Sequence, residues 1–241
     1  MKNKVRSLLA KMPMLKKFLL LYQNRNKILQ TLPTKIVNGK NNNIRISNSA
    51  LLFNCVFEIS GNNNIIEIDD LAVLNNLKFH ISGDNHLVNI GKGVRFNNKG
   101  SIWLEDNNCE VNIGENTTIE DADLAITEPK SILEIGKNCM FAYDIDIKTG
   151  DSHSIIDIRN NKRVNYAKKI SIGNHVWIAS HVSILKGVSI NDDSIVATRS
   201  LVTKSFEQKN VIIGGVPAII IKENITWDKM RIYERVDPNI H

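Results

Sequence analysis

Apolar residues recur every six positions over much of the chain, most regularly after residue 170. The recurring positions there are Ile172, Ile178, Ile184, Ile190, Val196 and Val202, and the same spacing links Ile90 to Phe96 and Ile102, and Ile135 to Phe141 and Ile147. A period of six fits neither an α-helix nor a heptad repeat. It fits one flat side of a three-sided coil of parallel strands, in which the repeated residue points inward on every side.

A longer period of 22 to 23 residues runs through the first half of the chain and indicates that such coils stack. The isoleucines at this spacing are Ile46, Ile68, Ile90, Ile113 and Ile135, and seven positions before each stands Gly39, Gly61, Gly83, Asp106 or Glu128. We interpret each unit as one coil of three six-residue sides plus about four corner residues. Because every coil covers the apolar edge of its neighbour, both ends of the stack need a cover.

These periods predict an all-β solenoid in three parts. A basic amphipathic helical segment is expected over residues 1–35, a β-helix over 36–205 with a protruding loop at 148–170, and a C-terminal cap and tail over 206–241. The composition agrees, since 35 Ile and 31 Asn favour short strands and tight left-handed corners. A chain of 241 residues is also long enough to bury a substantial core.

Positive charge is confined to the N-terminal segment. Residues 1–30 contain eight Lys or Arg and no Asp or Glu, so that of the total of 31 basic and 25 acidic residues the remainder holds 23 and 25, a net charge of −2. A nucleic-acid-binding function is therefore not expected, because no basic stripe crosses the main domain. The basic helix has two open interpretations, contact with an anionic membrane surface or packing against its own protein.

The cysteines and the hydropathy of the chain indicate a cytoplasmic protein. A location at the inner face of the membrane is the alternative. Cys55, Cys109 and Cys139 are odd in number and far apart, which predicts buried, reduced thiols. The longest apolar run near the N-terminus, residues 18–22, is too short to span a bilayer, and no secretory signal is recognisable.

One interruption of the repeat marks the expected functional site. The six-residue register is lost after Ile147 and returns at Ile172, and the polar segment between them contains His153 in the run Asp151-Ser152-His153-Ser154-Ile155. Insertions in solenoids emerge on one side and often form the binding face.

The stretch IGNHVWIASHVSILKGVSINDDSIVATRSLVTKSF, followed by GGVPAIIIKENITW, resembles the C-terminal half of the hexapeptide-repeat acyltransferases. More narrowly, residues 149–227 are similar to the branch that O-acetylates capsule, O-antigen and other bacterial surface sugars. This resemblance implies a left-handed β-helix, a homotrimer and acetyl-CoA as the co-substrate, with no metal required. It also implies that His153 is the catalytic base and that Trp177 lies near the thioester.

The resemblance further assigns a set of positions to coenzyme A, which lies between two subunits in the family. By motif position these are Ala179, Ser180, Ala197, Thr203, Lys204, Gly215, Pro217 and Lys222. The lysines would meet phosphate oxygens as point charges. The chain departs from the family pattern at Ala179, where glycine is usual, and at residues 205–207, which makes the thiol and adenine contacts less well defined.

The chemistry of sugar acetylation needs a group such as His153. A hydroxyl is a poor nucleophile at neutral pH, and a positioned base that removes its proton contributes roughly 100- to 10,000-fold to the rate. The second ring nitrogen needs an acceptor, for which Asp151 and a backbone carbonyl are the alternatives. A backbone N–H of the 177–179 turn is expected to stabilise the oxyanion. Since no Ser or Cys lies in a nucleophile motif, direct transfer is favoured over a covalent acyl-enzyme.

Three other functions compete with this hypothesis. The first is an amino-sugar N-acetyltransferase that acts on a nucleotide-linked sugar, and the second is a non-catalytic solenoid. The third is a zinc-dependent protein of the γ-class carbonic anhydrase type, suggested by the pairs His80/His86 and His175/His181. Six residues advance the chain by one face, so the members of such a pair point in directions roughly 120° apart.

Overall fold

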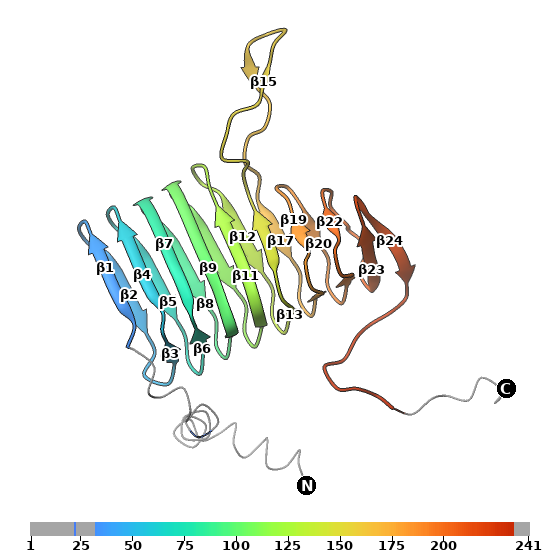
Figure 1. The fold of residues 1–241 in the computed structure, drawn as a ribbon, viewed down its shortest axis with the longest axis horizontal. Helices are drawn as coiled ribbons and strands as arrows, with labels where there is room; N and C mark the ends of the chain where they lie inside the picture. The colour runs from blue at the N-terminus through green and yellow to red at the C-terminus, as the bar shows by residue number, and fades with distance from the viewer. Residues whose placement is uncertain (1–21, 23–31, 234–241) are drawn as a thin grey trace, which may run out of the picture.

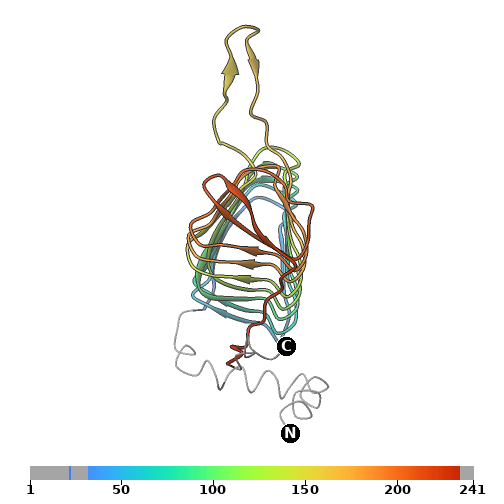
Figure 2. The ribbon, with the colours of Figure 1, turned by 90° about the vertical axis from the view of Figure 1, so that its right-hand side faces the viewer.

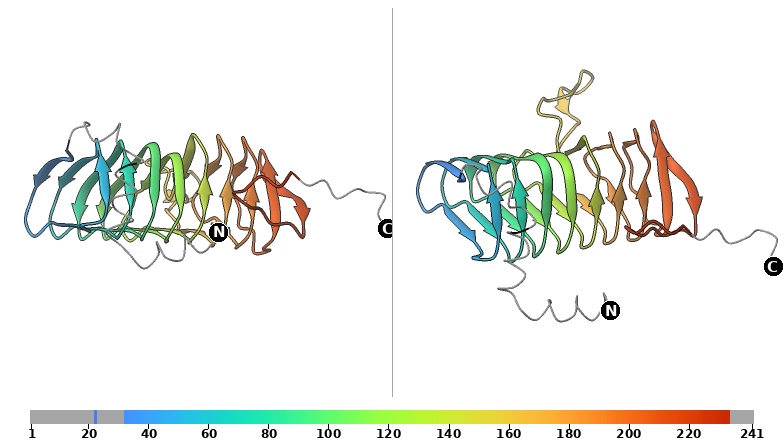
Figure 3. Two further views of the ribbon diagram at one scale, coloured as in Figure 1. Left: turned by 90° about the horizontal axis from the view of Figure 1, so that it is seen from below. Right: turned by 60° about the horizontal axis from the view of Figure 1, so that its bottom comes forward.

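The computed structural model describes Tyr22 and residues 32–233, which form one solenoid of short strands stacked coil upon coil (Figure 1). Seen along its length, the solenoid has three sides, and an arm projects from one of its corners (Figure 2). Figure 3 shows from two more directions that the coils follow one another in chain order. The all-β solenoid predicted from the six-residue repeat is confirmed.

Face 1 of the solenoid is a seven-stranded sheet in which every pairing is parallel. Its strands are, in spatial order, β2 (Asn43–Ile46), β5 (Ile65–Ile68), β8 (Leu87–Ile90), β10 (Glu110–Ile113), β12 (Ile132–Ile135), β17 (Ile170–Ile172) and β20 (Ser189–Ile190).

Faces 2 and 3 belong to one 15-stranded sheet, because β9 (Arg95–Asn107) and β11 (Thr118–Ile126) bend around the corner between them. Face 2 also contains β3 (Leu51–Phe53), β6 (Val73–Asn75), β13 (Met140–Phe141), β18 (Trp177–Ile178), β21 (Ile195–Val196) and β23 (Val211–Gly215). Face 3 also contains β1 (Thr34–Asn38), β4 (Val56–Ser60), β7 (Leu77–Asp84), β14 (Ile145–Lys148), β19 (Ser183–Ile184) and β22 (Leu201–Val202).

The remaining strands lie at the arm and at the C-terminal end. β15 (Ile156–Asp157) and β16 (Lys162–Arg163) form a small antiparallel hairpin in the arm. β24 (Ala218–Glu223) pairs antiparallel with β23.

The isoleucines of the long period stack directly on one another inside the solenoid. Ile68 pairs with Ile90, Ile90 with Ile113, and Ile113 with Ile135, and each is at most 3% exposed. The ladder then crosses the insertion, since Ile135 pairs with Ile172. These partners are 37 positions apart instead of the usual 22 or 23, because the segment between Lys148 and Ile170 projects from the stack without disturbing its register.

The corners require backbone conformations that ordinary residues avoid, and this explains the abundance of asparagine. Among the described residues, 21 non-glycine residues have positive φ and 11 of these are Asn, whose side chain tolerates the left-handed region. Gly61 has φ +136°, and a Cβ there would lie 1.9 Å from the carbonyl oxygen of Gly83 in the next coil. Glycine is therefore required at this corner.

The three cysteines are unpaired and buried, as predicted. Burial raises the pKa of Cys55, Cys109 and Cys139 each to about 11. At neutral pH they are protonated, apolar parts of the core rather than nucleophiles.

The predicted N-terminal helix falls outside the described residues apart from Tyr22 and residues 32–35, and β1 begins at Thr34. Contact of residues 1–30 with a membrane surface therefore stays a prediction. Over Tyr22 and residues 32–233, no helix is long and apolar enough to cross a bilayer.

Shortening one core side chain should destabilise the stack strongly. The rings of Phe57 and Phe79 stack at 4.5 Å and are fully buried, so Phe79→Ala should lower the free energy of unfolding by about 3–5 kcal/mol. Urea unfolding at fixed protein concentration measures this change. Lys92→Ala, at an exposed corner, is the control, and an equal loss in both variants would contradict the nearest-neighbour description of the core.

Candidate active site

The arm that carries His153 leaves the solenoid at the corner between faces 3 and 1. It starts after β14 at Lys148 and rejoins the stack at Ile170, the first residue of β17. Figure 1 shows the arm standing clear of the coils, with β15 near its tip. The break in the sequence repeat therefore corresponds to a projecting segment, and His153 lies near its base.

Asn165 holds the base of the arm together through both ends of its side-chain amide. Its Nδ2 donates to the carbonyl oxygen of His153 at 2.7 Å and to Asp151 Oδ2 at 2.8 Å. Its Oδ1 accepts hydrogen bonds from the backbone N–H of Ile155 at 2.7 Å and from Nε of Arg163 at 3.1 Å. Asn165 is only 6% exposed, so these bonds are shielded from water and fix the backbone on both sides of His153.

Charged groups reinforce this base. Lys186 Nζ, from the next coil, donates to Asp151 Oδ2, and Arg163 Nη2 donates to Glu128 Oε1. The hydrogen bond from Lys186, followed by that from Asn165, holds the pKa of Asp151 below its usual range. Asp151 is thus an ionised anchor that ties the arm to the solenoid.

The imidazole of His153 is exposed and has no hydrogen-bond partner among the residues of the described range 32–233. Sequence analysis left Asp151 and a backbone carbonyl as alternatives for orienting this ring, but in this chain the Asp151 carboxylate is engaged by Lys186 and Asn165 instead. Asn165 and Lys186 were not identified from the sequence. The arrangement fixes the His153 backbone and leaves both ring nitrogens open to a substrate.

Trp177 lies elsewhere, at the start of β18 on face 2, where the C-terminal tail packs beside it. Trp227 of the tail stacks on His175 with ring centroids 4.3 Å apart and donates from Nε1 to the His175 carbonyl oxygen at 2.8 Å. The ring centroids of Trp227 and Trp177 are 6.1 Å apart. The C-terminal tail therefore lies beside Trp177 through Trp227. The spacing of residues in the sequence does not predict this contact.

Small residues from consecutive coils line the corner between faces 2 and 3. The N–H of Ala179 donates to Val196 O and that of Ala197 to Ile213 O, both within 2.9 Å. Gly215 follows in the next coil and donates to Ser200 Oγ at 3.3 Å, with Pro217 exposed beyond it. A Cβ at the neighbouring Gly214 would lie 3.0 Å from the Cβ of Ala197. The predicted positions 179, 180, 197, 215 and 217 are thus brought together as a strip of small side chains.

Two of the three N–H groups of the 177–179 turn, where the oxyanion donor is expected, are already engaged. The N–H groups of Trp177 and Ala179 both donate to backbone carbonyls of the next coil, at 2.9 Å each, so neither is free to meet an oxyanion. Ser180 follows in the same turn, and its N–H has no acceptor among the residues that the structure describes.

The remaining predicted coenzyme A residues lie apart from this strip. Thr203 and Lys204 are exposed at the face 3–face 1 corner, and the ammonium of Lys204 lies 5.7 Å from the ring centroid of Phe206. Lys222 is exposed on β24, opposite Ile212. In one chain, then, the arm with His153 and the strip of small residues occupy different corners, with face 3 between them.

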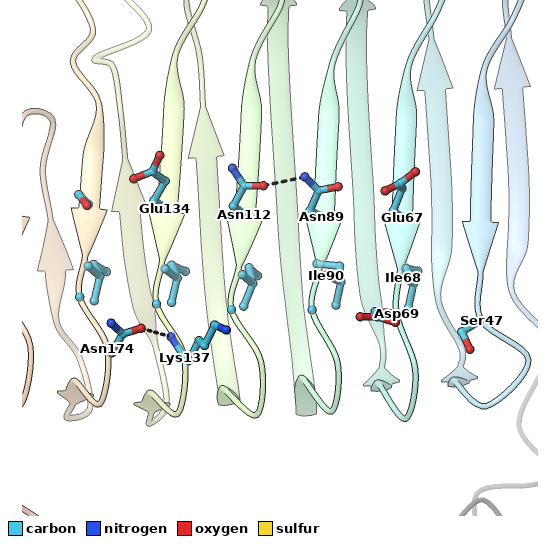
Figure 4. A pocket seen from close by; sticks show the side chains of 18 of the residues that line it. Ser47, Glu67, Ile68, Asp69, Asn89, Ile90, Asn112, Glu134, Lys137 and Asn174 are labelled. Carbon is cyan, nitrogen blue, oxygen red and sulfur yellow. Dashed lines mark hydrogen bonds between the residues drawn. The ribbon is translucent and has the colours of Figure 1, made fainter. Parts of the chain in front are cut away.

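A large groove among the described residues contains none of the predicted site residues. It has a volume of about 980 Å³ and runs along face 1, between outward side chains such as Glu67, Asn89 and Asn112 and the corner at Lys137 and Asn174 (Figure 4). Asn89 donates to Asn112 across one coil step at 2.7 Å. Its walls carry carboxylates, amides and a lysine, and no histidine is among its lining residues.

His86, His175 and His181 have structural partners. His86 is buried and accepts a hydrogen bond from the N–H of Cys109 at 3.1 Å, while His175 and His181 lie at different corners beside Asp193 and Asp144. Within the described part of the chain no three His, Cys, Asp or Glu side chains gather into a group that would hold a metal ion.

Comparison with characterised proteins places this geometry in a family. The chain is 34% identical over 146 residues to a polysialic acid O-acetyltransferase of Neisseria meningitidis, covering 60% of this chain and 67% of that protein. It is 38% identical over 118 residues to the polysialic acid O-acetyltransferase of Escherichia coli O1:K1, although the match spans only 38% of that protein's length. No protein-family model matches the chain.

Two solved structures share nearly the whole solenoid. The polysialic acid O-acetyltransferase OatWY superposes with a TM-score of 0.77 at 32% identity, covering 87% of this chain and 98% of that one. The polysialic-acid-specific acetyltransferase NeuO gives a TM-score of 0.71 at 34% identity, covering 82% and 89%. The chain belongs to the hexapeptide-repeat acyltransferases. It is an acetyltransferase of their sugar O-acetyltransferase branch, as the sequence resemblance implied.

Removing the Asn165 amide should loosen the arm without unfolding the solenoid. Asn165→Ala deletes four hydrogen bonds at the arm base, so backbone amides over residues 151–166 should exchange with solvent at least about tenfold faster. Hydrogen exchange read by mass spectrometry measures this. Ser154→Ala, at an exposed position of the same arm, serves as the control, and equal exchange in the two variants would refute the anchoring role.

The Asp151 anchor should depend on pH in a defined direction. Since its pKa is lowered in the folded protein, the anchor stabilises the arm above the ordinary carboxyl pKa and is lost as pH falls through the lowered value. Lys186→Met removes the largest cause, so the pKa of Asp151 should rise and the arm should loosen at a higher pH. A carboxyl-carbon NMR titration of parent and variant tests this, and identical titration curves would contradict it.

Proposed function

We propose that the protein transfers the acetyl group of acetyl-CoA to a sugar hydroxyl of a bacterial surface polysaccharide, capsule or O-antigen, or of its precursor. The observation that carries this proposal is the match to OatWY and NeuO over more than four-fifths of the chain. OatWY and the relatives of Neisseria meningitidis and Escherichia coli are named polysialic acid O-acetyltransferases, and NeuO is named a polySia-specific acetyltransferase. A capsule polysaccharide of this kind is accordingly the first acceptor to test.

His153 acts as the general base. As the sugar oxygen attacks the thioester carbonyl carbon, the imidazole takes the hydroxyl proton. The carbon–sulfur bond then breaks, the acetyl group stays on the sugar oxygen, and the imidazolium returns its proton to the departing thiolate. The exposed ring of His153 on an anchored backbone supports this role.

The donor is bound along the strip of small residues. Without bulky side chains, the corner formed by Ala179, Ala197 and Gly215 lets an extended pantetheine arm approach the backbone closely. The Ser180 N–H is the oxyanion donor in this proposal. Exposed Lys204 and Lys222 would meet the phosphates of coenzyme A.

The active unit is a homotrimer. His153 and the strip of small residues lie on different corners of one chain, so a cleft between two copies unites an arm from one with a strip from the other. Closed rings of identical chains are the usual way to repeat such a contact. We place the enzyme in the cytoplasm, with residues 1–30 as its contact to the inner membrane face, and no nucleic acid or metal takes part.

Replacing His153 should abolish most of the turnover and leave the stability of the protein unchanged. His153→Ala should lower kcat by about 100-fold or more, with an unchanged melting temperature because the side chain is exposed. Ser154→Ala, an exposed neighbour in the same arm, is the control. A His153→Ala enzyme with the parent's kcat would show that another group accepts the proton.

An acceptor screen tests the reaction class. Acetyl-CoA is offered with polysialic acid, other purified capsule polysaccharides, their monosaccharides and amino-sugar nucleotides, and the products are read by mass. Acetyl esters on a polysaccharide support the proposal, whereas amides on an amino-sugar nucleotide would support the competing N-acetyltransferase.

A further inference from the structure

Face 3 exposes a large aromatic residue on its outer surface, three strands from the N-terminal edge. Trp103 points outward from β9 and is 37% exposed. Its neighbours in the same outward row are Glu58 on β4, His80 on β7, Ala125 on β11 and Lys148 on β14.

One face of the indole is covered by a ring that is itself held in place. The rings of His80 and Trp103 stack with centroids 3.7 Å apart and planes 18° from parallel. His80 Nδ1 lies 3.2 Å from Glu58 Oε2, which also accepts a hydrogen bond from Lys78 Nζ at 2.9 Å. These two hydrogen bonds lower the pKa of Glu58, so it stays a carboxylate that orients the imidazole. The ring pair is therefore preorganised.

The opposite face of the indole looks onto a gap in the row. Its partner in the next coil is Ala125, whose methyl group covers little of the ring, and the coil after that presents Lys148. Two coil steps span about 10 Å, and only the methyl group of Ala125 stands between the indole and Lys148 in this row. We call the space over Ala125 the slot. Asp123 stands beside this slot and accepts from Ser101 Oγ at 2.5 Å through Oδ1.

The slot suits a pyranose. The C–H face of a sugar ring packs against an aromatic plane, while its hydroxyls need fixed polar partners at the rim. Trp103 Nε1 and His80 Nε2 have no hydrogen-bond partner among the residues of the described range, so one donor and one further polar nitrogen stand at the edge of the stack.

The slot is also aligned with the candidate active site. Lys148 ends β14 and is followed directly by the arm that carries His153. A linear glycan that lies along face 3 would thus run along the solenoid from Trp103 to the base of the arm. On the other side of the ring pair, a small cleft of about 240 Å³ between Asn38, Ser60 and Ser82 continues the same path.

We propose that Trp103, His80 and Ala125 form a glycan-binding platform that holds a polysaccharide acceptor at a distance from the reacting sugar. The platform rests on the proposed function, since it presumes a polymeric sugar acceptor. It recognises chain length: a polymer engages the platform and the arm together, whereas a short oligosaccharide engages only the arm. Linking two such contacts raises the apparent affinity for the polymer alone.

Two variants test the platform in different ways. Trp103→Ala removes the stacking surface, and Ala125→Leu keeps it but fills the slot. Tyr233→Ala, an exposed aromatic in the tail, is the control, and circular dichroism checks that each variant is folded. Binding of long polysialic acid, of a sialic acid trisaccharide and of dextran to the full chain is measured by calorimetry, and acetyl transfer to the same glycans is measured separately.

We expect both platform variants to weaken binding of the long polymer by about tenfold or more and to raise its KM with kcat unchanged. The trisaccharide KM should not change, and Tyr233→Ala should behave as the parent. If the parent binds neither polymer, or if Trp103→Ala and Ala125→Leu bind as tightly as the parent, the platform is refuted. Trp103-dependent binding without acetyl transfer to any glycan would instead refute the proposed function and leave the platform standing.

Discussion

Parallel pairing between consecutive coils, in a register that stacks like residue on like residue, is the constraint on which the whole molecule depends. Ile90, Ile113 and Ile135 form one such ladder, and Phe57 on Phe79 belongs to another. Each coil is stabilised by burial against its two neighbours, and no coil has a core of its own. Every functional side chain is therefore placed by its position within a coil and by the number of that coil.

Because of this register, residues at equivalent positions of successive coils line up in rows. Ala179, Ala197 and Gly214 occupy matching corner positions of three successive coils, and Glu58, His80 and Trp103 occupy one outward row of face 3. A row follows the solenoid axis, which is the geometry that an extended ligand needs. Pantetheine and a linear polysaccharide are both extended, so one architecture offers tracks to donor and acceptor alike.

The part of the structure that follows from periodicity could be predicted from the sequence. Ile172, Ile178 and Ile184 face the core because their spacing equals one side of the coil, and the loss of that spacing after Ile147 located the arm with His153. The contacts that fix the site have no period. Asn165 is one polar residue among many in the arm, and its role depends on how the arm folds back. Trp227 reaches His175 across 52 residues only because the tail returns along the outside of the coils.

The arm interrupts the chain but not the register of the parallel strands. Ile135 still pairs with Ile172, although the two residues are 37 positions apart along the chain. Scaffold and arm are thereby independent modules. Natural variation can lengthen residues 149–169, change their charge or replace them, while every strand of the solenoid keeps its pairing partner. A lineage of such enzymes can thus acquire a new sugar preference without first rebuilding the framework that presents it.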